Sequence, residues 1–231
     1  MEKRLASIVK DYGSPIYVYD GDLIEQRFKQ FKNAFNVNDL KIHYAAKALT
    51  NLSILKLFKN LGAGLDCVSP EEIKLGLKAG FKPEDIIFTP NGVCFSEYET
   101  AIEAGTKITI DSLPALEKLG YKKIKHPVFI RINPHLNAGG NNKIRVGHID
   151  SKFGISIHQI PLVLRLVKRY KINVEGIHIH TGSDIIDPDI FERVAELVFS
   201  VADNFDNIKS LDFGSGFKVK YRENDLYTNV D

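Results

Sequence analysis

Apolar, β-branched runs alternate with amphipathic helical runs along most of this chain, and that alternation restricts the fold more than any other feature of the sequence. The runs typical of strands lie at 41–47, 64–69, 85–90, 107–112, 127–133, 174–182 and 209–214. The helical patterns between them lie at 51–61, 70–79, 96–104, 112–119, 160–170 and 187–205. Repeated strand-then-helix units with short links predict a parallel sheet, buried on both faces, with right-handed crossovers.

The number of strands predicts an α/β fold, a (β/α)8 barrel of the TIM type that is incomplete in this chain. A closed barrel has eight strands and about 250 residues, whereas this sequence has 231 residues and roughly seven strand-helix units. We therefore expect one domain over residues 1–231, truncated before the closing strand. The stretch 15–20 also has a strand pattern and would pair outside the barrel, ahead of a helical pattern at 23–35. The long irregular stretch 134–151 is typical of a functional loop.

Composition excludes several classes of protein. Lys and Arg number 31 and Asp and Glu 29, scattered along the chain, so a nucleic-acid partner is not expected. Cys67 and Cys94 have neither the spacing of a zinc site nor that of a disulfide framework, which favours a reducing cytoplasm. No signal peptide and no apolar run of about 20 residues is present, so we expect a soluble protein without a membrane partner.

The predicted strands end in polar residues, and in parallel α/β folds ligands bind beyond those ends. The residues at these ends are Lys47, Asp66, Thr89, Asn91, Asp111, Arg131, Asn133, His178, His180 and Asp212. Some of them have a structural explanation. We interpret Asp111, before Ser112, as a helix cap, and Asp212 as a residue that caps or orients a loop.

Lys47 lies at the end of the first barrel strand, where five of the six flanking residues from His43 to Leu49 are aromatic, aliphatic or alanine. We expect these neighbours to desolvate the ammonium and to favour a free amine that forms an imine. A lysine that snorkels from a strand end to water would have the same sequence pattern.

Two small-residue turns follow neighbouring strands, Thr181-Gly182-Ser183 and Gly214-Ser215-Gly216. Their backbone N–H groups would form a nest that suits a phosphate. His178 and His180 are two apart on a strand and face the same side. Because no acidic third ligand has a fixed spacing from them, we expect an imidazole against a flat cofactor and no metal site. With an activated lysine, these features predict a phosphate-bearing carbonyl cofactor.

At these residues the sequence resembles the pyridoxal-phosphate decarboxylases with an alanine-racemase-type barrel, the group IV decarboxylases, and among them the diaminopimelate decarboxylases. The resemblance rests on seven ordered motifs, at 15–20, 44–48, 64–69, 131–134, 151–155, 176–183 and 211–217. It covers the chain almost from end to end and corresponds to the N-terminal part of the family's fold.

The resemblance implies pyridoxal 5′-phosphate as the cofactor. Lys47 would hold it as a Schiff base, His180 would stack on its ring, and Asp66 would support the nearby hydrogen-bond network. Its phosphate would be bound by Ser183, Gly214, Ser215 and Gly216. Arg131 and His148 would lie near the substrate.

The reaction implied by the resemblance is the decarboxylation of meso-diaminopimelate to L-lysine, a carbon–carbon lyase step of lysine biosynthesis. The cofactor ring would accept the electrons left when CO2 departs. The full-length form would be a homodimer. The motifs at 138–140 and 151–154 favour diaminopimelate over other amino acids by resemblance.

The sequence departs from the family pattern at several points. The glycine triplet reads Gly214-Ser215-Gly216, and Leu49 replaces an asparagine. The chain also ends before the family's Glu-Pro-Gly-Arg strand and its C-terminal β-domain, so we expect it to be inactive or impaired by itself. Three alternatives stay open: a decarboxylase for ornithine, arginine or carboxynorspermidine, a non-catalytic cofactor-binding regulatory relative, and a lysine-dependent aldolase without pyridoxal phosphate.

Overall fold

The computed structural model of the chain describes residues 2–136 and 151–229. The chain divides into two compact units, residues 1–38 with 231 and residues 39–230. The prediction of one domain over residues 1–231 stays a prediction.

In its described part, the first unit consists of two helices, α1 (Glu2–Tyr12) and α2 (Gly21–Asn33). The Asp20 carboxylate begins α2 by accepting a hydrogen bond from the Leu23 N–H at 3.1 Å. The predicted strand at 15–20 is wrong, because these residues have no strand pairing among the described residues and Tyr17, Val18 and Tyr19 are exposed. An extended segment needs a neighbouring strand to satisfy its backbone groups, and this unit contains none in its described part.

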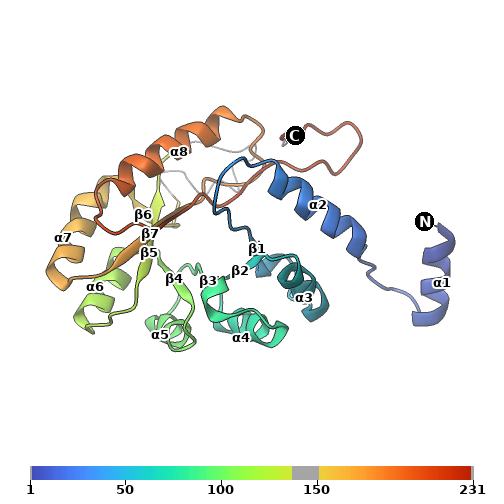
Figure 1. Ribbon diagram of the computed structural model, residues 1–231, viewed down its shortest axis with the longest axis horizontal. Coiled ribbons are helices and arrows are strands. Elements are labelled where there is room, and N and C mark those ends of the chain that lie inside the picture. The colour runs from blue at the N-terminus through green and yellow to red at the C-terminus, as the bar shows by residue number, and fades with distance from the viewer. Residues whose placement is uncertain (1, 137–150, 230–231) are drawn as a thin grey trace. The chain divides into compact units, whose positions relative to one another are not determined.

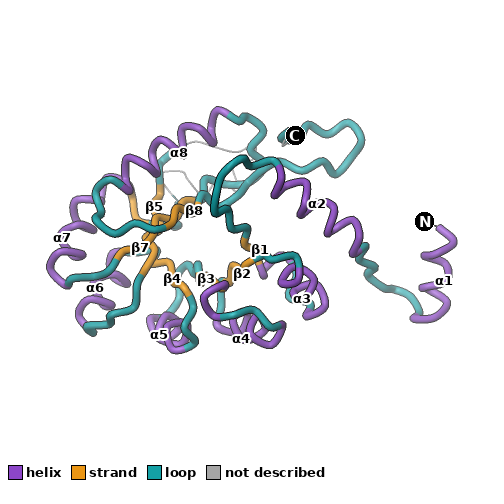
Figure 2. Tube along the Cα trace, viewed as in Figure 1, coloured by secondary structure: helices purple, strands orange, loops and turns teal. Residues whose placement is uncertain are grey.

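The second unit is built on a curved parallel sheet, which Figure 2 shows in orange. The strands follow the order β1-β2-β3-β4-β5-β7-β8, and β6 pairs with β5. Their bounds are β1 His43–Ala45, β2 Gly64–Cys67, β3 Ile86–Phe88, β4 Lys107–Ile110, β5 Val128–Asn133, β6 Ile155–Ser156, β7 Val174–Ile179 and β8 Ser210–Asp212. All seven predicted barrel strands are present, and the sequence pattern missed the two-residue strand β6.

Helices line the outer side of this curved sheet (Figure 1). Their bounds are α3 Leu52–Asn60, α4 Pro70–Ala79, α5 Phe95–Glu103, α6 Leu113–Tyr121, α7 Ile160–Tyr170 and α8 Asp189–Ala202. The predicted ends of α4 are confirmed: the Ser69 hydroxyl caps the Glu72 N–H at 3.2 Å, and Gly80 ends the helix with φ of 96°. No helix in the described ranges is long and apolar enough to cross a membrane.

The hydrophobic core lies between the sheet and these helices. Its fully buried members come from both layers and include Leu55, Leu65, Phe88, Ile108, Leu116, Ile130, Val163 and Ile177. Strand-then-helix units that curl in this way form an incomplete TIM-type barrel, which confirms the predicted fold class. Because the strands are parallel, their carboxyl ends meet at one edge of the sheet.

The contact between β5 and β7 depends on a glycine. The register between these strands shifts near Val128 and Phe129, and Phe129 lies opposite Gly176. A Cβ atom on Gly176 would lie 2.2 Å from Cε1 of the Phe129 ring, closer than atoms can approach. The glycine therefore makes room for a buried aromatic ring.

Replacing Gly176 with alanine should lower the free energy of unfolding by about 1–3 kcal/mol, because the added methyl group overpacks the core. Urea denaturation measures the change. The same replacement in a Phe129→Leu background should cost clearly less, since the clashing ring is gone. Equal costs in the two backgrounds would contradict this account of the contact.

Candidate functional site

Polar side chains from several strands meet at the carboxyl edge of the sheet. Arg131 on β5 pairs in register with His178 on β7, and His178 pairs with Asp212 on β8. Side chains in register on neighbouring strands face the same side of a sheet. The three side chains therefore form one row across the interior of the curved sheet.

Lys47 lies in the short 3₁₀ turn Ala46–Ala48 directly after β1, and its side chain is exposed. The expectation that its apolar neighbours desolvate it is wrong. Tyr44 instead stacks on Phe58 of α3, with ring centroids 3.9 Å apart, and Ala46 is fully buried in the core. Side chains alternate across a strand, so apolar neighbours in sequence pack away from the lysine. The Lys47 charge nevertheless helps to lower the pKa values of Asp66, His178 and His180.

Asp66, on β2 beside the β1 end, is paired in register with Ala45. Its carboxylate accepts a short hydrogen bond from the Thr89 hydroxyl at the end of β3. The pKa of Asp66 is raised to about 6, mainly by burial and in part by the Asp212 charge, while the Thr89 hydrogen bond and the Lys47 charge oppose the rise. The carboxyl group thus titrates close to neutral pH.

Arg131 is buried, with 7% of its surface exposed. Its guanidinium carbon lies 4.8 Å from the centre of the Phe153 ring, a cation–π contact. Burial lowers the pKa of Arg131, whereas Asp111, Asp66 and Asp212 raise it. The positive charge of Arg131 therefore interacts with three carboxylates and offsets part of the free-energy cost of burying them.

His178 in β7 and His180 directly after it are held in the neutral form. The pKa of His180 is lowered to about 4, mainly by burial and in part by the Arg131 charge. Burial also lowers the pKa of His178, whose Nδ1 lies 3.6 Å from Asp212 Oδ2 and has no hydrogen-bond partner in the described part of the chain. Both rings are therefore uncharged at neutral pH.

The two small-residue turns touch each other. A Cβ atom on Gly216 would lie 2.2 Å from the Gly182 carbonyl oxygen, so only glycine allows this approach. The Gly214 N–H donates to Asp212 Oδ1 at 2.8 Å, which confirms that Asp212 orients this loop. The Ser215 N–H lies 3.4 Å from Nδ1 of His180, and Ser183 is exposed. The turns and the His180 ring thus form one surface.

Asp111 does not cap α6, which corrects the prediction. Its two carboxylate oxygens accept hydrogen bonds from the Tyr98 hydroxyl at 2.8 Å and from Asn91 Nδ2 at 2.9 Å. The local pattern before Ser112 concealed these partners, because both come from distant parts of the chain. His148, expected near the substrate, lies outside the described residues.

The residues present fit a phosphorylated aldehyde with a flat ring. An exposed primary amine, a neutral imidazole and a pair of glycine turns in contact lie at one edge of one sheet. A Cβ atom on Gly216 would fill the space between the two turns. Without it, an anion can approach the backbone of the turns closely. Thr89, His178 and Asp212 also belong to this edge, as the polar strand ends predicted. The sequence pattern gave Thr89 no specific role, because its partner Asp66 lies on another strand.

Comparisons with known proteins point to the same type of site and confirm the resemblance. The family model described as pyridoxal-dependent decarboxylase, pyridoxal binding domain, matches residues 21–230. A diaminopimelate decarboxylase of Methanothermobacter thermautotrophicus is 31% identical over 97% of this chain and 54% of its own length. One from Helicobacter pylori is 33% identical over 97% of this chain and 58% of its own length.

The fold is also similar to a solved structure, that of diaminopimelate decarboxylase from Helicobacter pylori complexed with L-lysine. The TM-score is 0.87 and the identity 32%, over 98% of this chain and 60% of that chain. The chain spans little more than half the length of the curated relatives it matches.

His43, at the beginning of β1, is a partly buried base outside the candidate site. Its ring packs against Gly64, and its Nε2 has no hydrogen-bond partner among the described residues. The pKa of His43 is lowered from 6.5 to about 4, mainly by burial, with the Asp212 charge opposing the shift and the Lys107 charge adding to it. Between these values the unfolded chain binds a proton that the folded chain does not, so stability falls as the pH falls from 6.5 to about 4.

A His43→Gln variant should lack this acid sensitivity. Between pH 7 and pH 4, we expect the wild type to lose up to about 3 kcal/mol more stability than the variant, from the separation of the two pKa values. Urea denaturation at a series of pH values measures the difference. Comparing the two proteins removes the opposing contribution of Asp66, which both contain. Parallel stability curves would contradict the assignment.

Proposed function

Because this chain belongs to the family of pyridoxal-dependent decarboxylases, we propose that it forms the pyridoxal 5′-phosphate site of an enzyme that decarboxylates meso-diaminopimelate to L-lysine. One observation carries the proposal: Lys47, His180 and two contacting glycine turns share the carboxyl edge of a parallel sheet. Barrels of this type bind substrates and cofactors at that edge. The relatives named above are diaminopimelate decarboxylases.

Lys47 is the proposed point of covalent attachment. When bound, pyridoxal phosphate supplies an electron sink for the electrons left by departing CO2. The exposed Lys47 amine is within reach of an incoming aldehyde, and the Asp66 carboxylate balances its positive charge. With a pKa of about 6, Asp66 is ionised at pH 7 and takes up a proton only as the pH falls towards 6.

His180 is proposed to stack on the cofactor ring. Its Nδ1 accepts from the Ser215 N–H, so the proton of the neutral ring is on Nε2. This contact fixes the orientation of the ring. A neutral imidazole suits this role, because a charged one would be repelled by Arg131 and Lys47.

The phosphate is proposed to lie against the two turns, at Ser183, Gly214, Ser215 and Gly216. The Ser183 hydroxyl is exposed at the end of the first turn and can donate to an anion. The Gly214 N–H is already bonded to Asp212, so this glycine shapes the turn, with φ of 66°. The close approach of Gly216 to Gly182 holds the two turns against each other, and we propose that one anion contacts both of them.

Arg131 is too well buried to be an open docking point for a large substrate. We propose that it neutralises Asp66, Asp111 and Asp212, and its assignment to the substrate, like that of His148, stays a prediction. A homodimer, a cytoplasmic location and impaired activity of the isolated 231-residue chain also stay predictions.

Lys47→Ala should abolish covalent capture of pyridoxal 5′-phosphate, because Lys47 follows β1 directly and its charge influences the pKa values of Asp66 and His180 in the proposed site. The chain is mixed with the cofactor, reduced with borohydride, and the modified peptide is located by mass spectrometry. Lys56→Ala, at an exposed lysine of α3, is the matched control and should be labelled like the wild type. Labelling spread equally over several lysines, with Lys47 not preferred, would refute the attachment site.

The substrate is tested by adding amino acids to the cofactor-loaded chain. The absorbance of the lysine-bound cofactor should change with meso-diaminopimelate and L-lysine at concentrations about tenfold or more below those needed for ornithine or arginine, a difference of roughly 1.4 kcal/mol. The physical reason is that a diaminopimelate site holds a second charged amino-acid end. A preference for ornithine or arginine would favour the alternative substrates, and no response to any of them would favour a regulatory relative.

A further inference from the structure

The segment after the second glycine turn is exposed, apart from one polar residue near its end. Tyr221 and Leu226 are 79% and 71% exposed, and Tyr227 is exposed as well, whereas Thr228 is 7% exposed. A buried threonine in an exposed segment needs partners for its hydroxyl group. Those partners are Ile185 and Lys218, which follow the two proposed phosphate turns.

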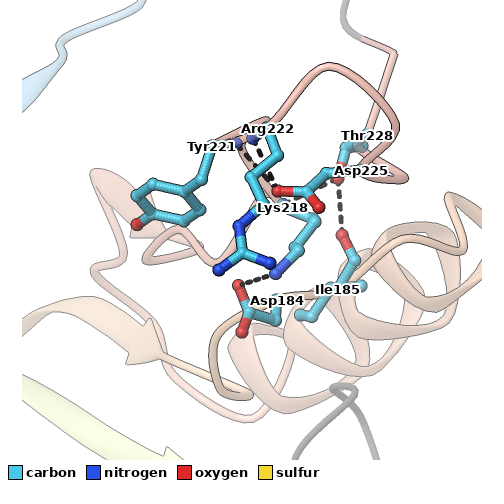
Figure 3. A network of polar contacts seen from close by, with 7 residues as sticks. All are labelled: Asp184, Ile185, Lys218, Tyr221, Arg222, Asp225 and Thr228. Carbon is cyan, nitrogen blue, oxygen red and sulfur yellow. Dashed lines mark hydrogen bonds and ion pairs between the residues drawn. The ribbon is translucent and has the colours of Figure 1, made fainter.

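Asp225 reverses the chain so that Thr228 returns to the turns. Its carboxylate accepts hydrogen bonds from the Tyr221 N–H at 3.1 Å and the Arg222 N–H at 2.8 Å, and its own N–H donates to the Arg222 carbonyl at 3.1 Å. Figure 3 shows this tight loop, with the Thr228 side chain pointing towards Ile185. Thr228 then pairs with Lys218, ten residues earlier in the chain, through a hydrogen bond from its N–H to the Lys218 carbonyl at 2.9 Å.

The Thr228 hydroxyl joins segments from both turns. It donates to the Ile185 carbonyl at 2.5 Å and accepts from the Lys218 N–H at 2.8 Å. Ile185 follows the first turn by two residues, and Lys218 follows the second turn by two residues. One hydroxyl group therefore spans the continuation of Thr181-Gly182-Ser183 and that of Gly214-Ser215-Gly216.

Ile185 links Thr228 to the second turn through its backbone. It is almost fully buried, and its N–H donates to the Gly216 carbonyl at 2.9 Å. The Lys218 N–H also approaches the Ile185 carbonyl at 3.2 Å. The carbonyl that receives the Thr228 hydroxyl thus belongs to the residue that holds Gly216 next to Gly182.

An ion pair also joins the same segments, between Lys218 Nζ and Asp184 Oδ1 at 3.1 Å (Figure 3). Both side chains are only partly buried, and ion pairs near the surface contribute little to stability. A buried hydrogen bond to a backbone carbonyl leaves that carbonyl underbonded when the donor is removed. The hydroxyl of Thr228 is therefore the buried side-chain group that joins the two segments, in addition to the backbone hydrogen bonds of Ile185 with Gly216 and Lys218.

We propose that Thr228 is a positioning residue that holds the two glycine turns in the arrangement that binds the cofactor phosphate. This inference rests on the proposed function, since it concerns the phosphate end of the same site. Thr228 acts through the backbone of Ile185 and Gly216, and it touches neither Lys47 nor His180 in the described structure. Its loss should weaken binding of the phosphate and leave the reaction of the aldehyde with Lys47 intact.

Two aldehydes separate these effects: pyridoxal 5′-phosphate, and pyridoxal, which lacks the phosphate. Capture of each by Lys47 is measured by titration of absorbance on the full 231-residue chain. Thr228→Val, which keeps the shape but removes the hydroxyl, should weaken capture of pyridoxal 5′-phosphate by about fivefold or more, the effect of one hydrogen bond. Capture of pyridoxal should stay within about twofold, a change too small to count as a lost hydrogen bond. Thr228→Ser should restore the affinity for the phosphorylated aldehyde.

A matched control is Thr106→Val. Thr106 is fully buried, and its hydroxyl donates to the Ala101 carbonyl at 2.9 Å between α5 and β4, away from the turns. This variant should lower the thermal stability without changing the preference for the phosphorylated aldehyde. If Thr228→Val does not fold, Asp225→Ala tests the same connection, because it loosens the loop that returns Thr228 and should also cause a phosphate-selective loss.

Equal weakening of both aldehydes, or of neither, in Thr228→Val or Asp225→Ala would overturn the inference. Failure of the proposed function has a different signature: the wild-type chain itself would then capture neither aldehyde through Lys47.

Discussion

The parallel pairing of β5, β7 and β8 is the constraint on which the rest of the site depends. It sets Arg131, His178 and Asp212 side by side, one from each strand. Residues 47 and 34 positions apart in the chain become neighbours in this way, because parallel strands align their carboxyl ends at one edge. The polar row lies on the inner face of the sheet, because the outer face carries apolar side chains that pack against the helices.

Burial then determines the charge of each group in this row. Without water, an ionised side chain is stabilised only by nearby opposite charges and hydrogen bonds. The charge of Arg131 interacts with three carboxylates, while His178 and His180 stay neutral. The hydrogen bond and positive charges near Asp66 do not fully offset the effect of burial, so its pKa is about 6. The site therefore combines two neutral imidazole rings with one buried cation.

Much of the fold could be predicted from local patterns, and the errors have physical causes. The bounds of α4 and α7 were predicted to the residue, because capping residues and apolar periodicity are local signals. Residues 15–20 have a strand composition, but a strand also needs a partner, which a local pattern cannot supply. The prediction that Asp111 is a cap failed for the same reason, because its partners Tyr98 and Asn91 lie in other parts of the chain, which a local pattern does not include.

The sequence by itself determined the alternation of strands and helices, the polar strand ends and the seven family motifs, because each is a property of neighbouring residues. Only the tertiary structure decided which of these residues meet. It left Lys47 exposed in spite of apolar neighbours, since those side chains alternate into the core. It also brought Thr228 from an exposed tail into contact with Ile185, a hydrogen bond between residues 43 positions apart. Such contacts depend on how distant segments pack, and no local pattern encodes them.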